Sequence, residues 1–326
     1  MAPPPFSMER TKYDMSSFWG RTRYWAESIS PVMLLENERT LQKAQMLLDR
    51  WKDGQAGNAS DAELWHARMA VESCIHPTTK EVLSPVFRMS MFLPMNYFVV
   101  PVMMMPSTVM SISRTIAIQW FNQSYNSAVN YANRSSDAQP ASEIAKAYTA
   151  AVVVACGGSL TATMWLKRVP TGTVKATLIR ASVPYLAVSC AAVVNLASMR
   201  KNEWLSSGEG IRVVDEDGRE RGTSTAAGFD SLKKCSATRV IWNLPCMVLP
   251  TLCMMPLLRV SRLARRHSVA TESFLQMLGI SIGVPPALAA YALTQTIPAT
   301  KLEPRLQNLT REDGSPVQNF TYYKGL

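Results

Sequence analysis

Residues 181–199 read ASVPYLAVSCAAVVNLASM and carry no charged side chain between Arg180 and Arg200. A helix needs roughly 17 to 25 mainly apolar residues to cross the hydrocarbon core of a bilayer, so this run is long enough to span a membrane. Further uncharged runs of comparable length occur at residues 89–113, 147–166, 240–258 and 273–300. One such run could be a buried helix of a soluble protein, but five of them predict an all-α membrane protein with about five transmembrane helices.

An amphipathic helix is predicted directly after the first run. Residues 115–133, TIAIQWFNQSYNSAVNYAN, are uncharged but too polar to face lipid. On a helix, amides three or four positions apart share one face: Gln119, Asn122, Asn126, Asn130 and Asn133. The small and aromatic residues Phe121, Tyr125, Ala128 and Ala132 fall on another face. A helix on a membrane surface normally carries lysine or arginine on its polar face, so the amides indicate a face turned toward protein or a polar cavity.

The segments outside the bundle are predicted from their caps and turns. Residues 1–88 form a soluble, mostly helical region, with one helix over 37–51 and a second opened by the capping-box pattern Ser60 to Glu63. The second helix should end at Ile75, because the residue before Pro77 disfavours helical geometry. The transmembrane bundle covers 89–300 and includes a hydrophilic loop, 197–238, in which VVDEDGRERG predicts a tight turn or small hairpin. Residues 301–326 form a C-terminal tail.

Composition excludes several classes of function. The net charge is +10, with an apolar fraction of 47% and a mean hydropathy of -0.01. The sequence has no zinc-finger spacing, no RNP-like motif and no dense basic stripe, so a nucleic-acid partner is not predicted. The six cysteines form no CxxC pair, and the three histidines show no triad or metal spacing. We therefore expect no enzyme activity, no metal and no cofactor.

Several motifs resemble those of the sideroflexin family, in order and over nearly the whole chain. They are CIHPTTKE (74–81), RMSMFLPMN (88–96), WFNQSYNSAVNYANRSS (120–136), GIRVVDEDGRERGTS (210–224) and the ending YYKGL. The sequence departs from the family pattern at Thr78 and Lys80, where the family has an acid and a glycine, and at Ala197, where it has a proline.

The resemblance implies five spans in the mitochondrial inner membrane, no cleaved presequence, and transport of serine or similar small neutral amino acids. The N-terminal sequence likewise has no apolar segment typical of a secretory signal. Some family members are instead connected with iron, haem or respiratory-chain assembly. The alternative function is therefore a membrane scaffold or assembly factor that moves no substrate; its protein partners are not identified by the sequence.

Candidate residues for substrate binding or for the substrate pathway are polar groups in or beside the spans. They are His76, Asn96, Asn122, Gln123, Asn126, Asn130, Asn133, Arg180 and Asn195. Arg180 could receive a substrate carboxylate or could reach toward the lipid headgroups. His76 could titrate near physiological pH or could simply end a helix. Amides can bind both the ammonium and the carboxylate of an amino acid, but the amide face could also be only a packing surface.

Charge also predicts an orientation. Five spans put the two termini on opposite sides of the membrane. The N-terminal side would then hold the loops 167–180 and 259–271, which contain Lys167, Arg168 and a cluster of arginines. By the positive-inside rule, the N-terminus is expected in the matrix.

Overall fold

The computed structural model describes residues 3–325 except 56, 77–79, 133–140 and 169–173. The N-terminal region consists of α1 (Phe18–Ser28), η1 (Pro31–Leu35), α2 (Glu38–Lys52) and α3 (Asp61–Cys74). The predicted capping box is confirmed: the Ser60 hydroxyl accepts from the Glu63 backbone, and the Glu63 carboxylate accepts from the Ser60 backbone at 2.8 Å. Helix α3 ends at Cys74 and Ile75 is extended, as the proline after His76 predicts.

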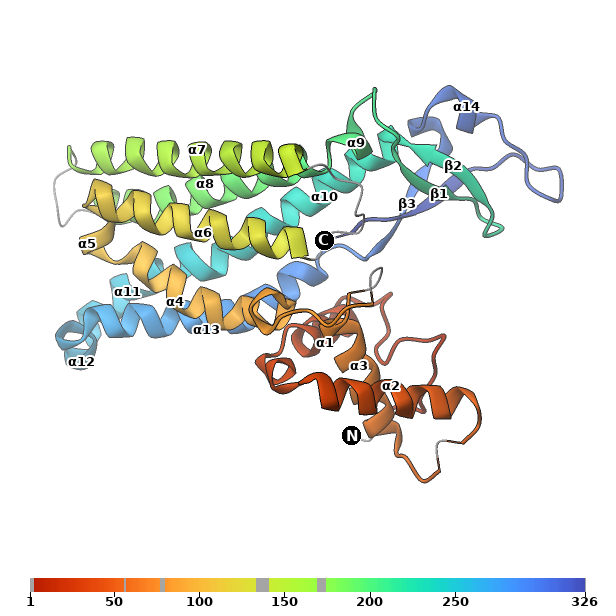
Figure 1. The fold of residues 1–326 in the computed structure, drawn as a ribbon. Coiled ribbons are helices and arrows are strands. Elements are labelled where there is room, and N and C mark those ends of the chain that lie inside the picture. Colours follow the sequence, from red (N-terminus) through yellow and green to blue (C-terminus); the bar gives the residue numbers. More distant parts are fainter. Residues whose placement is uncertain (1–2, 56, 77–79, 133–140, 169–173, 326) are drawn as a thin grey trace.

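The bundle is built from long helices that lie side by side (Figure 1). They are α4 (Phe92–Met104), α6 (Ile112–Ala132), α7 (Ala141–Leu166), α8 (Val174–Met199), α10 (Thr225–Asn243), α11 (Leu249–Val260) and α13 (Ser268–Ala289). Short helices connect them or precede them: η2 (Pro85–Phe87), η3 (Met89–Met91), α5 (Pro106–Val109), α9 (Lys201–Trp204) and α12 (Arg262–Arg266). Among the described residues, three stretches are long and apolar enough to cross a membrane, namely Ala145–Trp165, Lys175–Met199 and Thr225–Val260.

The uncharged runs do not coincide with the ends of the helices. The longest helix that lies within the first run is α4, with 13 residues or about 20 Å, because the chain breaks at Met105 before Pro106. The fourth run is the second half of a 36-residue rod, Thr225–Val260, in which a π-helical turn at Leu244–Val248 joins α10 to α11. The predicted loop at 197–238 is therefore shorter than expected. The fifth run leaves its helix at Ala289.

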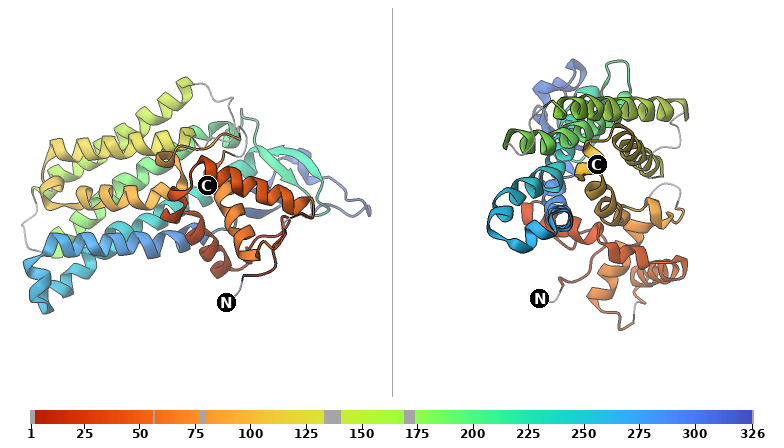
Figure 2. Two further views of the ribbon diagram at one scale, coloured as in Figure 1. Left: turned by 60° about the horizontal axis from the view of Figure 1, so that its bottom comes forward. Right: turned by 90° about the vertical axis from the view of Figure 1, so that its left-hand side faces the viewer.

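Both termini lie at the same end of the bundle, whereas the sequence predicts them on opposite sides of the membrane. Figures 1 and 2 show the N-terminal region and the C-terminal strands at one end, with α5 and α12 at the other. The Arg21 guanidinium of α1 donates to the Ala289 carbonyl at the end of α13 at 2.9 Å, just before the C-terminal strands begin. The cause is α6, the uncharged but polar helix, which runs back along the bundle between α5 and α7.

A small sheet caps this end of the bundle. Its strands are β1 (Ile211–Val214), β2 (Glu220–Ser224), β3 (Thr294–Pro298) and β4 (Asn319–Tyr323), in the order β2-β1-β4-β3. The predicted hairpin is confirmed as β1 and β2, with Gly218 in the left-handed region at φ 81°. The strands β3 and β4 were not predicted. The C-terminal tail also contains η5 (Ala299–Lys301) and α14 (Pro304–Gln307).

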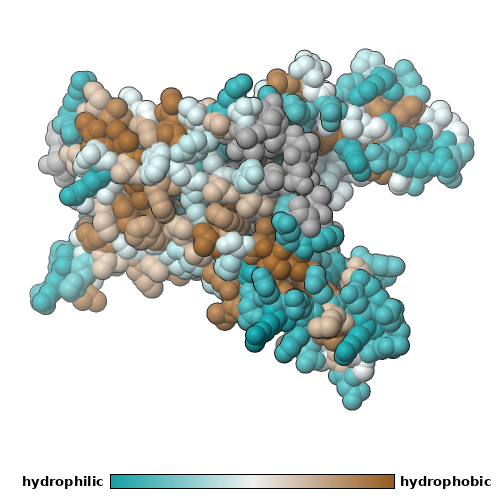
Figure 3. Space-filling view, in the orientation of Figure 1, coloured by the Kyte–Doolittle hydropathy of each residue, from teal (hydrophilic) through white to brown (hydrophobic). Residues whose placement is uncertain are grey.

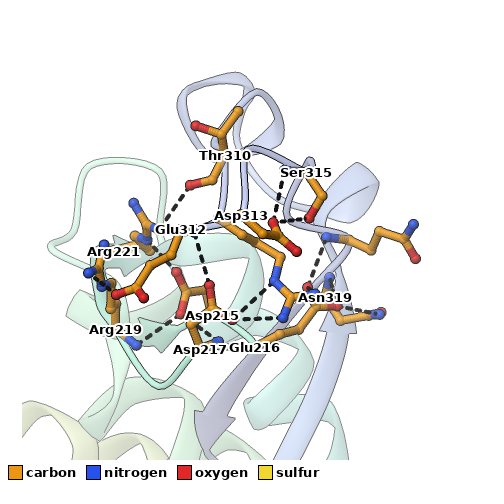
Figure 4. A network of polar contacts seen from close by, with 12 residues as sticks. Asp215, Glu216, Asp217, Arg219, Arg221, Thr310, Glu312, Asp313, Ser315 and Asn319 are labelled. Carbon is orange, nitrogen blue, oxygen red and sulfur yellow. Dashed lines mark hydrogen bonds and ion pairs between the residues drawn. The ribbon is translucent and has the colours of Figure 1, made fainter.

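Ion pairs clamp the hairpin turn to the C-terminal tail (Figure 4). The buried Asp215 carboxylate accepts from the backbone N–H groups of Asp217 and Arg219, at 3.0 and 2.9 Å, and pairs with Arg221. The Arg311 guanidinium of the tail reaches back to Asp217 at 2.7 Å. Hydrogen bonds from Arg311 lower the pKa of the Asp217 carboxyl. Attraction between these carboxylates and guanidinium groups therefore holds the hairpin turn against the C-terminal tail.

Acid should release this clamp. A carboxyl whose folded pKa is depressed stabilises the fold above its ordinary pKa, about 4, and this contribution is lost as pH falls further. We expect Arg311→Gln to lower the melting temperature of the purified protein at pH 7, and the difference from the wild type to shrink below about pH 4. The matched control is Lys301→Gln, an exposed lysine of the same tail, which should have little effect at any pH. An equal loss for both variants would contradict the clamp.

Candidate functional site

The amide face of α6 is buried against the bundle. Its described members are Gln119, Asn122 and Asn126, and Gln123 lies beside them. Gln119 and Gln123 are each 1% exposed and Asn122 is 6% exposed. On the other side of the helix Trp120 is 54% exposed, with Ile116 and Phe121 beside it. The amphipathic helix is therefore present as predicted, with its amides toward protein and its large apolar side chains outward.

Gln119 is the best-defined member of the amide face. Its Nε2 group donates to the Ser159 hydroxyl of α7 at 2.9 Å and approaches the Met103 sulfur of α4 at 3.5 Å. Its Oε1 atom is buried and has no hydrogen-bond partner among the described residues. Leaving such an acceptor unpaired costs about 1 to 3 kcal/mol, so this carbonyl is available to a water or a ligand. Further along the helix, the Asn126 amide contacts Asn122 Oδ1 at 3.4 Å.

A small cavity of about 10 Å³ lies beside Gln119, between α4, α5, α6, α7 and α8. Its lining includes Thr115, Ser159 and Thr163 as well as the apolar Met103 and Pro184. A volume of this size holds about one water molecule. Two of the hydroxyls are already engaged: Thr163 donates to the Val109 carbonyl at 3.0 Å and Thr115 donates to the Thr108 carbonyl at 2.8 Å. The polar groups of the cavity lining that remain available to a ligand are therefore those of Gln119 and Ser159.

The other predicted residues do not join this cavity. Asn96 is in α4 and donates to the Phe92 carbonyl of its own helix at 2.7 Å. Asn195 is in α8, 2% exposed, with a buried Oδ1 that lacks a partner in the described part of the chain. It lies 11 residues beyond Pro184, about 16 Å along the helix. The backbone of Asn130 and Arg180 lies in α6 and α8, but their side chains, and all of Asn133, lie outside the described residues.

His76 is buried in the N-terminal region rather than in the bundle. Its backbone N–H donates to the Glu81 carbonyl at 2.9 Å, and its carbonyl accepts from Lys80 at 3.0 Å. These bonds close a turn in which Lys80 takes a left-handed conformation at φ 60°. Glycine adopts that conformation without strain, which gives a physical reason for the glycine that the resembling motif has at this position.

The sequence reasoning missed the partners of the amide face. Small residues repeat every fourth position on the buried side of α7: Ala147, Ala151, Ala155, Ser159 and Thr163. Such a stripe lets two helices approach closely, and its spacing is visible in the sequence.

The structure also contains a buried acid that was not predicted. The carboxylate of Glu272 in α13 accepts a hydrogen bond from Thr251 of α11 at 2.8 Å. Gln276, one turn along, is 1% exposed and has an unpaired Oε1 among the described residues. No group of three or more potential metal-ligating side chains gathers anywhere in the described residues.

Sequence comparison places the chain among known proteins. A family model described as Sideroflexins matches residues 7–326. The chain is 32% identical to a Sideroflexin of Dictyostelium discoideum, and the match covers 99% of this chain and 98% of that protein. It is 33% identical to Sideroflexin FSF1 of Saccharomyces cerevisiae, with the same coverage, and 30% identical to human Sideroflexin-5 over 99% of this chain and 94% of the relative. No solved structure matches.

Proposed function

The chain belongs to the sideroflexin family, and from this membership we propose that it is a secondary transporter of serine or a similar small neutral amino acid in the mitochondrial inner membrane. One observation carries the proposal: the buried, unpaired Gln119 carbonyl beside the cavity between α4 and α8. An amino acid presents an ammonium group that donates hydrogen bonds and a carboxylate that accepts them. Amide and hydroxyl groups supply both complements without a fixed charge.

Transport requires a second conformation. The cavity has room for about one water molecule and is too small for an amino acid, so transport would need a more open arrangement of this site. The buried stripe on α7 has short side chains, so α6 can shift along α7 without unlocking large interdigitated groups. Small sliding movements of packed helices are a known route to opening a site. We place the substrate between the amide face and this stripe once α6 has moved.

The same small cavity supports a second function. A membrane scaffold or assembly factor for respiratory-chain or iron and haem metabolism needs no substrate path, and a bundle with so small a cavity suits it. The two functions differ in one property, because only a transporter binds a small solute within the bundle and carries it across.

The orientation follows from the charges at the two ends of the bundle. The connections around α12 and before α8 are basic, with Arg259, Arg262, Arg265 and Arg266 around α12. Figure 3 shows hydrophilic surface at both ends and apolar surface over the helices between them. The N-terminal region lies at the end opposite these basic connections, so their charge does not favour a matrix N-terminus. The positive-inside rule now favours the α12 end in the matrix and both termini in the intermembrane space.

Uptake into liposomes separates the two functions. The purified protein is reconstituted into liposomes, and entry of labelled serine is measured over time against protein-free liposomes. A transporter gives saturable uptake that unlabelled serine competes away. Uptake equal to that of the protein-free liposomes, for serine and for other small neutral amino acids, would favour the scaffold and sink the transport proposal.

A further inference from the structure

Exposed apolar side chains of the N-terminal region gather in the segments that contact the bundle. Those with large exposure are Phe18, Trp19, Val32, Leu35, Val82 and Val86, with Met46 as the exception. Trp19 is 70% exposed and Leu35 is 76% exposed, so each leaves a large apolar area in contact with water. The charged outer face of α2 has the opposite character, with Met46 between Lys43 and Arg50. The apolar surface is therefore placed on one side of the region.

Helix α1 packs against the end of α13. Its Trp25 and Ile29 are buried in one cluster with Leu93 of α4 and Leu288 of α13. Phe18 is seven residues before Trp25, so it lies on nearly the same face, about 10 Å further along the helix. Phe18 is exposed where Trp25 is covered, and Trp19 packs edge-on to it with ring centres 5.3 Å apart. The face of α1 that packs on the bundle at Trp25 is therefore exposed at Phe18.

A second apolar point lies beside the start of α4. Met33 of η1 points inward, and its carbonyl accepts from the Arg88 guanidinium at 3.1 Å. Val32 and Leu35 are three residues apart in a 3-10 helix, so they project together on one side. The two apolar sites therefore each lie beside the end of a bundle helix. Phe18 and Trp19 of α1 are near α13, and Val32 and Leu35 of η1 are near α4. Figure 3 shows apolar surface continuing from the bundle to its junction with the N-terminal region.

We propose that α1 and η1 form an interfacial anchor, in which Phe18, Trp19, Val32 and Leu35 insert into the lipid between the headgroups and the acyl chains. Tryptophan favours this depth because its ring is apolar and its N–H group is polar. The attraction is hydrophobic rather than electrostatic, since residues 1–88 contain eleven Lys or Arg and eleven Asp or Glu. The anchor fixes the height of the N-terminal region, including His76, against the bilayer. It does not depend on the transport proposal.

Fluorescence quenching in lipid nanodiscs tests the anchor, because both faces of a nanodisc are open to solutes. The Trp19 signal is the difference between the wild type and Trp19→Phe, in neutral phosphatidylcholine with and without bromine near the top of the acyl chains. The matched control adds Met46→Trp to Trp19→Phe. The control signal is the fluorescence that this second substitution adds, and it reports from the charged face of α2.

We expect brominated lipid to quench the Trp19 signal at least about twofold more than the control signal, and aqueous iodide to quench the control signal more strongly. High salt should change neither result, because no net charge drives the contact. Equal iodide quenching of the two signals, or no quenching of the Trp19 signal by brominated lipid, would overturn the anchor.

Discussion

Gln119→Leu is expected to reduce serine uptake by about tenfold or more while leaving membrane insertion and abundance intact. The substitution keeps the volume of the side chain but removes the donor to Ser159 and the unpaired carbonyl beside the cavity. Loss of one or two hydrogen bonds to the substrate, each about 1 kcal/mol, corresponds to a change of that size. Stability should fall little, because the unpaired acceptor is removed together with the donor.

The control for this variant is Phe121→Leu, which places the same side chain on the exposed side of α6. We expect its uptake to stay near that of the wild type, and Asn126→Leu to resemble Gln119→Leu. Initial rates in proteoliposomes, normalised to inserted protein, measure the difference. If Gln119→Leu and Asn126→Leu both transport normally, the amide face is only a packing surface.

Both ends of the chain are expected to respond alike to protease in mitochondria stripped of their outer membrane. Because the termini share one end of the bundle, epitope tags at the two ends should be digested together, and an epitope inserted between Arg266 and His267 should be spared. The effect is all-or-none, since a bilayer excludes the protease completely.

Each other result has a definite meaning. Digestion of the inserted epitope with protection of both terminal tags would keep the fold and reverse its orientation. Different fates for the two terminal tags would contradict the fold and restore the five-span arrangement.

The sequence predicted the parts of this fold that depend on local rules. The capping box at Ser60, the end of α3 before Pro77 and the hairpin turn at Gly218 each need only neighbouring residues, and each is confirmed. The burial of the amides on α6 was also predictable, because four amides on one helical face need partners. Their partner on α7 is 40 residues away from Gln119, so the contact depends on packing between helices.

What the sequence did not predict depends on distant contacts. The uncharged run 240–258 does not predict that its helix begins at Thr225, because charged residues such as Lys234 precede the run. In the structure Lys234 is held by Asp230 at 2.7 Å and by the Tyr322 hydroxyl of β4 at 3.0 Å. The return of α6 along the bundle depends on a distant contact as well. Residues 115–133 are uncharged but polar, and α6 buries its amides against the bundle.

Protection of a cysteine on the amide face by substrate tests the central claim most directly. In a variant without its native cysteines, Asn122→Cys, or Asn126→Cys, is labelled with a small hydrophilic thiol reagent in proteoliposomes, with and without serine. Phe121→Cys on the outer side of α6 is the control. If the amide face lines the substrate path, serine will slow labelling at positions 122 and 126 and leave position 121 unchanged. Labelling at one rate with and without serine at all three positions would contradict the account.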